Sequence, residues 1–270
     1  IDRYHEKWNW LAKLFLRMGE RTACAFAHET ISVSKSLQQY CINEYKAETV
    51  YIPNAVPTHN EKTSDKHLAS FGLTKGKYMV MVSRLVQHKG AHLLIKAFAN
   101  LKQKHRDNPE IQNLKLAIVG GSVYTDQYVR LLHQNASICN DIVFTDFQSG
   151  DVLTELYTNA KALVHPSLNE GLPITVLQAM SYGVPVLVSD IPEHLEMVKD
   201  VRVIFNENNV EAIEDAIMNF LLLDSETVEE ITELHKQVVA RNYSFDGIVP
   251  QIVEVYEKNR AKMKPLVQQI

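Results

Sequence analysis

Five short apolar runs that alternate with helical segments restrict the fold more than any other feature of the chain. The runs lie at residues 78–82, 114–119, 141–144, 162–165 and 184–188. Each is apolar almost throughout, as expected of strands buried on both faces of a sheet. The segments between them are long enough for the helices that connect parallel strands. The pattern predicts an α/β fold, with a Rossmann-like domain built on a parallel sheet.

A shorter strand–helix–strand pattern comes earlier in the chain. Strands expected at 30–34 and 49–52 flank a helix over 35–45, which Ser34 is placed to cap. We interpret this unit as the end of a second Rossmann-like domain without the beginning of that domain. The chain also starts at Ile1 rather than at Met. We therefore expect it to be a piece of a longer polypeptide.

Changes in composition suggest where the domains meet. Residues 57–75 are polar and poor in strand-forming residues, which is typical of a linker. The expected division is a remnant of an N-terminal domain at 1–56, a linker at 57–76, the main domain at 77–245 and a C-terminal helix at 246–270.

Residues 4–27 carry apolar side chains at nearly helical spacing, with basic residues on much of the other side. Two interpretations follow. A helix at a membrane surface would use its bases and its two Trp side chains, whereas a helix packed on a sheet would bury the apolar side. The acidic residues among the bases and the strand that follows directly favour packing on a sheet.

Composition argues against several classes of protein. The chain has 28 Lys and Arg, 32 Asp and Glu and a net charge of −4, so it has no basic field for nucleic acid. No apolar run approaches the roughly 18 residues that a membrane-spanning helix needs. Cys24, Cys41 and Cys139 have no zinc-binding spacing, and we expect reduced thiols in a cytoplasmic protein.

Polar residues follow the first two strands of the main domain, where open α/β sheets bind ligands. Ser83, Arg84 and Lys89 follow the first strand. An Arg and a Lys suit a diphosphate, because Arg donates two hydrogen bonds to phosphate oxygens and Lys adds a positive charge beside them. Solvated surface bases are the alternative. Gly120-Gly121 follows the second strand and permits a close approach of backbone or ligand.

The loops after the third and fourth strands add a base-binding and an anion-binding candidate. Phe147 and Gln148 offer an apolar face and a hydrogen bond to a base, although a Phe packed in the core is the alternative. Glu170 lies in a turn before a helix that opens near Pro173. Free N–H groups at such a helix start favour the binding of an anion. An ordinary strand-to-helix connection that carries a surface carboxylate explains the stretch equally well. Because all these loops follow strands of one sheet, we expect them to converge.

Two stretches in these loops resemble the donor-sugar half of the family 4 retaining glycosyltransferases, which have the GT-B fold. They are YMVMVSRLVQHKGAHLLIKAF at 78–98 and HPSLNEGLPITVLQAMSYGVPVLVSDIPEHLEMV at 165–198. Ile52-Pro-Asn-Ala-Val56 resembles the segment that leaves the family's N-terminal domain. Asn242-Tyr-Ser-Phe245 resembles the start of its last helix, which crosses back to that domain.

The resemblance implies a role for each of the loop residues. Arg84 and Lys89 would hold the diphosphate of the donor, and Glu170 would contact its sugar, so these three form the expected catalytic set. Gln178 stands where the family has a second Glu that holds the ribose, and Asp146 stands where Gly is usual. The expected donor-binding residues are Ser83, Gly120, Phe147, Gln148, Gly171, Leu172, Pro173, Ile174 and Gln178.

The resemblance also implies the reaction and the partners. We expect a hexosyltransferase-type glycosyltransferase of polysaccharide biosynthesis that uses a UDP- or GDP-sugar, without a metal, on a glycan or lipid-linked acceptor. It would lie in the cytoplasm, with peripheral contact at the inner membrane face. Because His28 and His165 do not match a catalytic His, we expect this fragment alone to be inactive. A non-catalytic nucleotide-binding or interaction module is one alternative, and a related GT-B phosphorylase or epimerase is another.

Overall fold

A computed structural model describes residues 9–58, 64–122, 124–206 and 209–267. Its main part is a six-stranded sheet with the strand order β5-β4-β3-β6-β7-β8, in which every neighbouring pair is parallel. The strands are β3 (Tyr78–Val82), β4 (Lys115–Val119), β5 (Ile142–Asp146), β6 (Ala162–His165), β7 (Val186–Ser189) and β8 (Ile204–Phe205). The predicted α/β class and parallel sheet are confirmed, and β8 is an additional strand.

The order of the strands reverses between β3 and β6. The chain moves outward from β3 through β4 to β5, and then returns to the other side of β3 for β6. In open α/β sheets, ligands bind outside the carboxyl ends of the strands at such a reversal. This reversal therefore predicts a ligand site beyond Val82 and His165, the last residues of β3 and β6.

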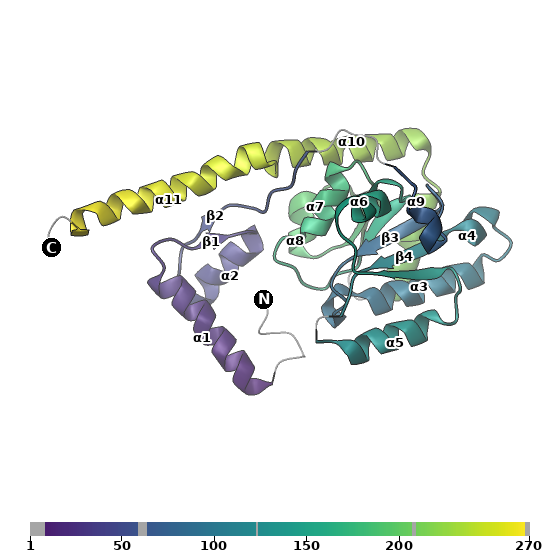
Figure 1. Cartoon of the computed structure of the whole chain (residues 1–270), viewed down its shortest axis with the longest axis horizontal. Coiled ribbons are helices and arrows are strands. Elements are labelled where there is room, and N and C mark those ends of the chain that lie inside the picture. The colour runs from purple at the N-terminus through teal and green to yellow at the C-terminus, as the bar shows by residue number, and fades with distance from the viewer. Residues whose placement is uncertain (1–8, 59–63, 123, 207–208, 268–270) are drawn as a thin grey trace.

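Helices cover both faces of this sheet (Figure 1). On one face α3 packs against α5 and α9, and on the other α7 packs against α10. All residues of β3, β6 and β7 are buried between these layers. The helices of this part are α3 (Ala91–Lys104), α4 (Pro109–Asn113), α5 (Asp126–Ala136), α6 (Gly150–Thr158), α7 (Ile174–Ser181), α8 (Pro192–Met197), α9 (Val210–Leu221) and α10 (Ser225–Asn242). Short 3-10 turns are η2 (Leu68–Phe71), η3 (Gln87–Lys89) and η4 (Val201–Val203).

A smaller unit precedes the main sheet. It contains α1 (Trp10–Phe26), β1 (Ile31–Ser32), α2 (Lys35–Tyr45) and β2 (Val50–Tyr51), and β1 and β2 pair in parallel. Ser34 caps α2 as predicted, since its side chain accepts a hydrogen bond from the Leu37 N–H at 3.2 Å.

The last helix, α11 (Phe245–Val267), extends from the main sheet along the small unit (Figure 1). A bridge between Val56 and Ser244 lies at its start. Further along, the Lys258 ammonium lies 3.3 Å from the Glu29 carboxylate. The helix therefore links the two parts of the chain.

The apolar side chains of α1 face outward. No residue of this helix is buried, and Trp10 and Phe26 are 76% and 81% exposed. Within the described residues α1 contacts α2, so the expectation that it packs on a sheet is not met. No helix in the described ranges combines the length and the apolar character needed to cross a membrane.

Candidate active site at the carboxyl ends of β3 and β6

Two turns meet at the point where the strand order reverses. The backbone carbonyl of His88, in η3 after β3, accepts hydrogen bonds from the turn after β6. The donors are the Leu168 N–H at 2.8 Å and the Ser167 hydroxyl at 3.2 Å. Gly90 has a φ of 75°, and a Cβ atom there would lie 2.1 Å from the Pro166 carbonyl oxygen. Only glycine permits this close packing of the two turns.

This packing brings Lys89 and Glu170 together. The Lys89 ammonium lies 2.5 and 2.7 Å from the two carboxylate oxygens of Glu170. Nε2 of His165, the last residue of β6, lies 2.9 Å from Glu170 Oε1. The Glu170 side chain is only 7% exposed, and that of His165 is fully buried. The cluster is therefore a buried carboxylate with two nitrogen partners, one from η3 and one from the end of β6.

The surroundings of Glu170 keep its carboxyl ionised. Burial opposes ionisation, but the hydrogen bond and charge of His165 and the nearby Lys89 outweigh it and hold the pKa of Glu170 far below its usual value. The arrangement thus presents a permanently negative group beside a cation.

A second histidine lies beneath this cluster. The ring of His194, in α8, meets the His165 ring edge-on at a centroid distance of 5.3 Å. Nδ1 of His194 lies 2.8 Å from the Ser189 carbonyl oxygen and therefore carries the hydrogen. Burial and the nearby His165 lower the pKa of His194 to about 3, so this histidine is neutral at neutral pH.

Arg84 and Ser83 lie at the end of β3 beside the cluster. The Arg84 side chain is exposed and has no ion-pair partner among the described residues. The Ser83 hydroxyl is buried and has no hydrogen-bond partner there. Gly120, at the end of β4, has a φ of 148° and approaches Ser83 so closely that a Cβ atom would lie 1.8 Å from its carbonyl oxygen. The ends of β3 and β4 are thus in backbone contact.

The loop after β5 presents Phe147 to solvent. Its side chain is 75% exposed, so the alternative of a Phe packed in the core is wrong. The Gln148 side-chain amide donates to the Thr145 carbonyl oxygen. Gly121, after β4, is close enough that a Cβ atom there would lie 3.8 Å from Phe147 Cβ, which places these two loops side by side.

The turn from Gly171 to Ile174 has free backbone donors. The N–H groups of Gly171, Leu172 and Ile174 make no hydrogen bond to other described residues. Pro173 occupies the N-cap of α7 rather than its first helical position, because the helix begins at Ile174. The small N-terminal unit reaches this turn, since the Asn54 amide donates to the Leu172 carbonyl oxygen at 3.0 Å.

Gln178 lies one turn into α7. Its amide oxygen is 3.4 Å from the hydroxyl of the buried Tyr157 in α6. Its side chain is partly exposed and carries no charge.

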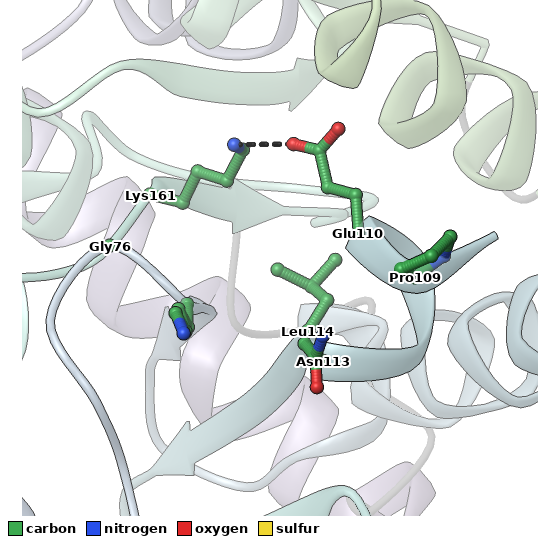
Figure 2. A pocket seen from close by; sticks show the side chains of 7 residues that line it. Gly76, Pro109, Glu110, Asn113, Leu114 and Lys161 are labelled. Carbon is green, nitrogen blue, oxygen red and sulfur yellow. Dashed lines mark hydrogen bonds and ion pairs between the residues drawn. The ribbon is translucent and has the colours of Figure 1, made fainter.

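A separate pocket lies at the opposite end of the sheet, where β3, β4 and β6 begin. It has a volume of about 310 Å³, and Lys161 and Glu110 form an ion pair of 2.8 Å beside it (Figure 2). Its lining residues are Gly76, Lys77, Pro109, Glu110, Asn113, Leu114 and Lys161. None of the predicted site residues lines it. Within the described residues, no group of three or more His, Cys, Asp or Glu side chains could hold a metal ion.

The structure thus brings Arg84, Lys89 and Glu170 to one edge, as expected from the strand order. The contact of His165 with Glu170 was not predicted, because the sequence indicated only a partly buried histidine at the end of a strand. The hydrogen bond between Asn54 and Leu172 was also not predicted, since no local pattern links residues that lie 118 positions apart.

Comparison with known proteins identifies the family. Residues 64–238 match the family model described as Glycosyl transferases group 1. An uncharacterized glycosyltransferase of Methanocaldococcus jannaschii is 32% identical over 183 residues, which are 67% of this chain and 45% of that protein. The D-inositol 3-phosphate glycosyltransferase of Salinispora arenicola is 26% identical over 268 residues, which are 92% of this chain and 58% of that protein. The chain spans about half the length of these relatives.

Solved structures share the fold. Anabaena HepE, in complex with UDP and glucose, matches with a TM-score of 0.77 at 23% identity, over 90% of this chain and 66% of that protein. Sucrose-phosphate synthase from Thermosynechococcus elongatus matches with a TM-score of 0.77 at 20% identity, over 93% of this chain and 62% of that protein. The fold is that of the GT-B glycosyltransferases, and by its family match the chain belongs to the group 1 glycosyltransferases.

Proposed function

We propose that the chain forms the donor half of a retaining, family 4, hexosyltransferase-type glycosyltransferase that uses a UDP- or GDP-sugar. One observation carries the proposal. Where the strand order reverses, Arg84, which has no ion-pair partner among the described residues, and Lys89 follow β3, and Lys89 contacts the buried Glu170 that follows β6. Two cations beside a carboxylate suit a donor that has an anionic diphosphate and a sugar rich in hydroxyls.

In this function Arg84 and Lys89 bind the diphosphate. The free N–H groups of Gly171, Leu172 and Ile174, at the start of α7, add neutral donors to the same anion. When the sugar leaves, negative charge grows on the departing nucleotide diphosphate, and cations already in place stabilise it without reorganisation. Glu170 accepts hydrogen bonds from the sugar. No step of this scheme requires a metal ion.

The nucleoside lies on the side of β4 and β5. The exposed Phe147 ring offers a face for the base, and Gln148 and the unpartnered Ser83 hydroxyl offer polar contacts. Gly120 lies at the same edge, and its lack of a side chain lets the ends of β3 and β4 approach each other. Gln178 takes the place of a ribose-binding carboxylate and binds through its neutral amide.

The acceptor is a glycan or a lipid-linked glycan. Among the similar proteins are an O-antigen chain mannosyltransferase of Escherichia coli and a putative colanic acid biosynthesis glycosyltransferase of Salmonella typhimurium. Residues 1–56 and the helix at 246–270 belong to the acceptor side, the segment at 57–76 links the sides, and 77–245 binds the donor. Transfer requires an acceptor site that faces this donor site, at the inner face of a membrane where the acceptor is lipid-linked.

A non-catalytic nucleotide-binding module is the second candidate. The observation that favours it is Gln178, whose uncharged amide oxygen is occupied by the Tyr157 hydroxyl. Sugar transfer by the full-length protein distinguishes the two candidates, because only the first predicts turnover.

The test is calorimetric titration of UDP, GDP and ADP, and of their glucose or mannose conjugates, into the chain. We expect one nucleotide class to bind, and Arg84→Ala to weaken it about tenfold or more, since a hydrogen bond between charged groups is lost. Glu170→Ala should abolish the additional affinity of the sugar conjugate.

Arg106→Ala is the matched control. Arg106 is also exposed and also lacks an ion-pair partner among the described residues, but it follows α3 and lies away from the ends of β3 and β6. Its replacement should leave binding unchanged. Equal effects of the two Arg variants, or no binding of any nucleotide by the unaltered chain, would contradict the proposed function.

A further inference from the structure

We propose that His165 is a positioning residue of this donor site, which holds the Glu170 carboxylate in place when a donor diphosphate draws Lys89 away. The inference rests on the proposed function and assigns a role to a histidine that lies below the site. The role is indirect, because His165 is fully buried and reaches the donor only through Glu170.

The first argument is competition for Lys89. In the free chain the Lys89 ammonium contacts both oxygens of Glu170, at 2.5 and 2.7 Å. A diphosphate that binds Lys89 takes at least part of this contact away. A buried carboxylate that loses its cation is strongly destabilised unless another donor remains. Among the described residues, His165 is the side chain that remains on Glu170.

The second argument is the direction of the hydrogen bond. An ionised carboxylate only accepts hydrogen bonds, so Nε2 of His165 must carry the hydrogen in the 2.9 Å contact with Oε1. In the free chain Lys89 shares Oε1 with His165 and also contacts Oε2. When a diphosphate draws Lys89 away, His165 still holds Oε1, and Oε2 becomes available to a sugar hydroxyl.

The third argument is that the His165 ring is itself held in place. It ends β6, and the His194 ring packs against it edge-on. His194 is fixed in turn, because its Nδ1 donates to the Ser189 carbonyl oxygen at 2.8 Å. The Ser189 hydroxyl donates at 2.5 Å to the carbonyl oxygen of Ser167, in the turn that carries Glu170. The His165 ring is thus supported by packing against a fixed neighbour rather than by a further hydrogen bond of its own, since its Nδ1 has no partner among the described residues.

The charged and titratable groups around His165 and Glu170 come from two elements, η3 and α8. Lys89 comes from η3, and His194 and Glu193 come from α8. His194 is neutral at neutral pH, because burial and the charge of His165 lower its pKa to about 3. The Glu193 carboxylate accepts a hydrogen bond from the Ser36 hydroxyl at 2.5 Å. Neither group replaces His165 as a hydrogen-bond donor to Glu170.

The experiment compares His165→Leu, which removes the donor, with His165→Gln, whose amide nitrogen restores an N–H near the position of Nε2. His235→Leu is the control, since His235 is also buried but lies in α10 and has no hydrogen-bond partner among the described residues. The dissociation constants of UDP and UDP-glucose are measured for each variant, or those of the nucleotide class that the unaltered chain binds.

We expect the preference for the sugar conjugate over the bare nucleotide to fall about tenfold in His165→Leu, because one hydrogen bond to a charged group is lost. It should stay within about twofold of the original value in His165→Gln and in His235→Leu. A merely structural histidine would weaken both ligands equally and would not be rescued by Gln, and that result would overturn the proposal.

A second measurement needs no ligand. The Glu170 carboxyl carbon is followed by NMR while the pH is lowered, and we expect Glu170 to take up its proton at a higher pH in His165→Leu than in the unaltered chain, with His165→Gln between them. If the chain binds neither nucleotide nor conjugate, the proposed function fails, and this titration alone decides the role of His165. An unchanged Glu170 titration in a folded His165→Leu chain would overturn the role.

Discussion

At the scale of single residues, Asp146 shows how a site tolerates an unfavourable backbone. This residue ends β5 with a φ of 57°, next to an irregularity in the pairing with β4. Its carbonyl oxygen accepts the Gly120 N–H at 2.9 Å, so the conformation joins two loops of the candidate site. Asp tolerates this left-handed region better than most residues, and Gly tolerates it best. The Gly that the family resemblance leads one to expect here thus has a physical reason.

Replacements of Asp146 should follow this backbone preference. We expect Asp146→Ala to be less stable than Asp146→Gly by about 1 kcal/mol, because Ala is strained at positive φ and Gly is not. Urea unfolding of the two variants measures the difference. Equal stability of the two would show that the left-handed conformation is not maintained in solution.

At the scale of elements, the junction of η3 and α3 determines the distance between Lys89 and Glu170. Gly90 joins the two helices and lies against Pro166, in the turn after β6. Both turns must approach within van der Waals contact for the Lys89–Glu170 ion pair to form. The geometry of the site therefore depends on a residue without a side chain.

Replacing Gly90 should disturb both stability and the site. We expect Gly90→Ala to destabilise the chain by about 3 kcal/mol, from backbone strain together with overlap with the Pro166 carbonyl. Gly76→Ala is the control, since Gly76 also has a positive φ of 69° but nothing lies within 4 Å of an added Cβ. It should cost about 1 kcal/mol, from strain alone. Unfolding midpoints in urea measure both, and similar losses in the two variants would contradict the close contact.

At the scale of the whole molecule, the fold buries uncharged histidines in two separate places. His194 lies beneath the site, and His235 lies in α10 against the other helices of the main domain. Burial lowers the pKa of His194 to about 3 and that of His235 to about 4. Unfolding exposes both to water, where they ionise at ordinary values near 6.5.

This burial makes stability depend on pH. Between the folded and unfolded pKa values the unfolded chain binds more protons, so stability falls as the pH decreases from about 6.5 toward 4. Each histidine should remove about 2 kcal/mol between pH 7 and pH 5. Urea unfolding at these two pH values measures how much free energy of unfolding is lost between pH 7 and pH 5. We expect this loss to be smaller by about 2 kcal/mol in His235→Leu than in the unaltered chain. An equal loss in the variant would mean that His235 is already charged or exposed in the folded chain.

Much of the fold was predictable because its signals are local. Strands β3 and β6 are confirmed with their predicted bounds, since continuous apolar runs between turn residues are a property of short sequence windows. Helix α2 also has its predicted bounds, because Ser34 is a capping residue next to it in sequence. Strand β8 and helices α4 and α8 were missed, because two to six residues are too few to show a period.

The sequence by itself thus determined the parallel sheet, the loops that follow its strands, and the placement of Arg84, Lys89 and Glu170 at one edge. Only the tertiary structure decided that Glu170 is buried between Lys89 and His165, that Asn54 reaches the turn before α7, and that the apolar side of α1 faces outward. The physical reason is how far apart in the sequence the interacting residues lie. Strand and helix patterns arise from neighbouring residues, whereas burial and hydrogen-bond partners depend on how distant segments pack.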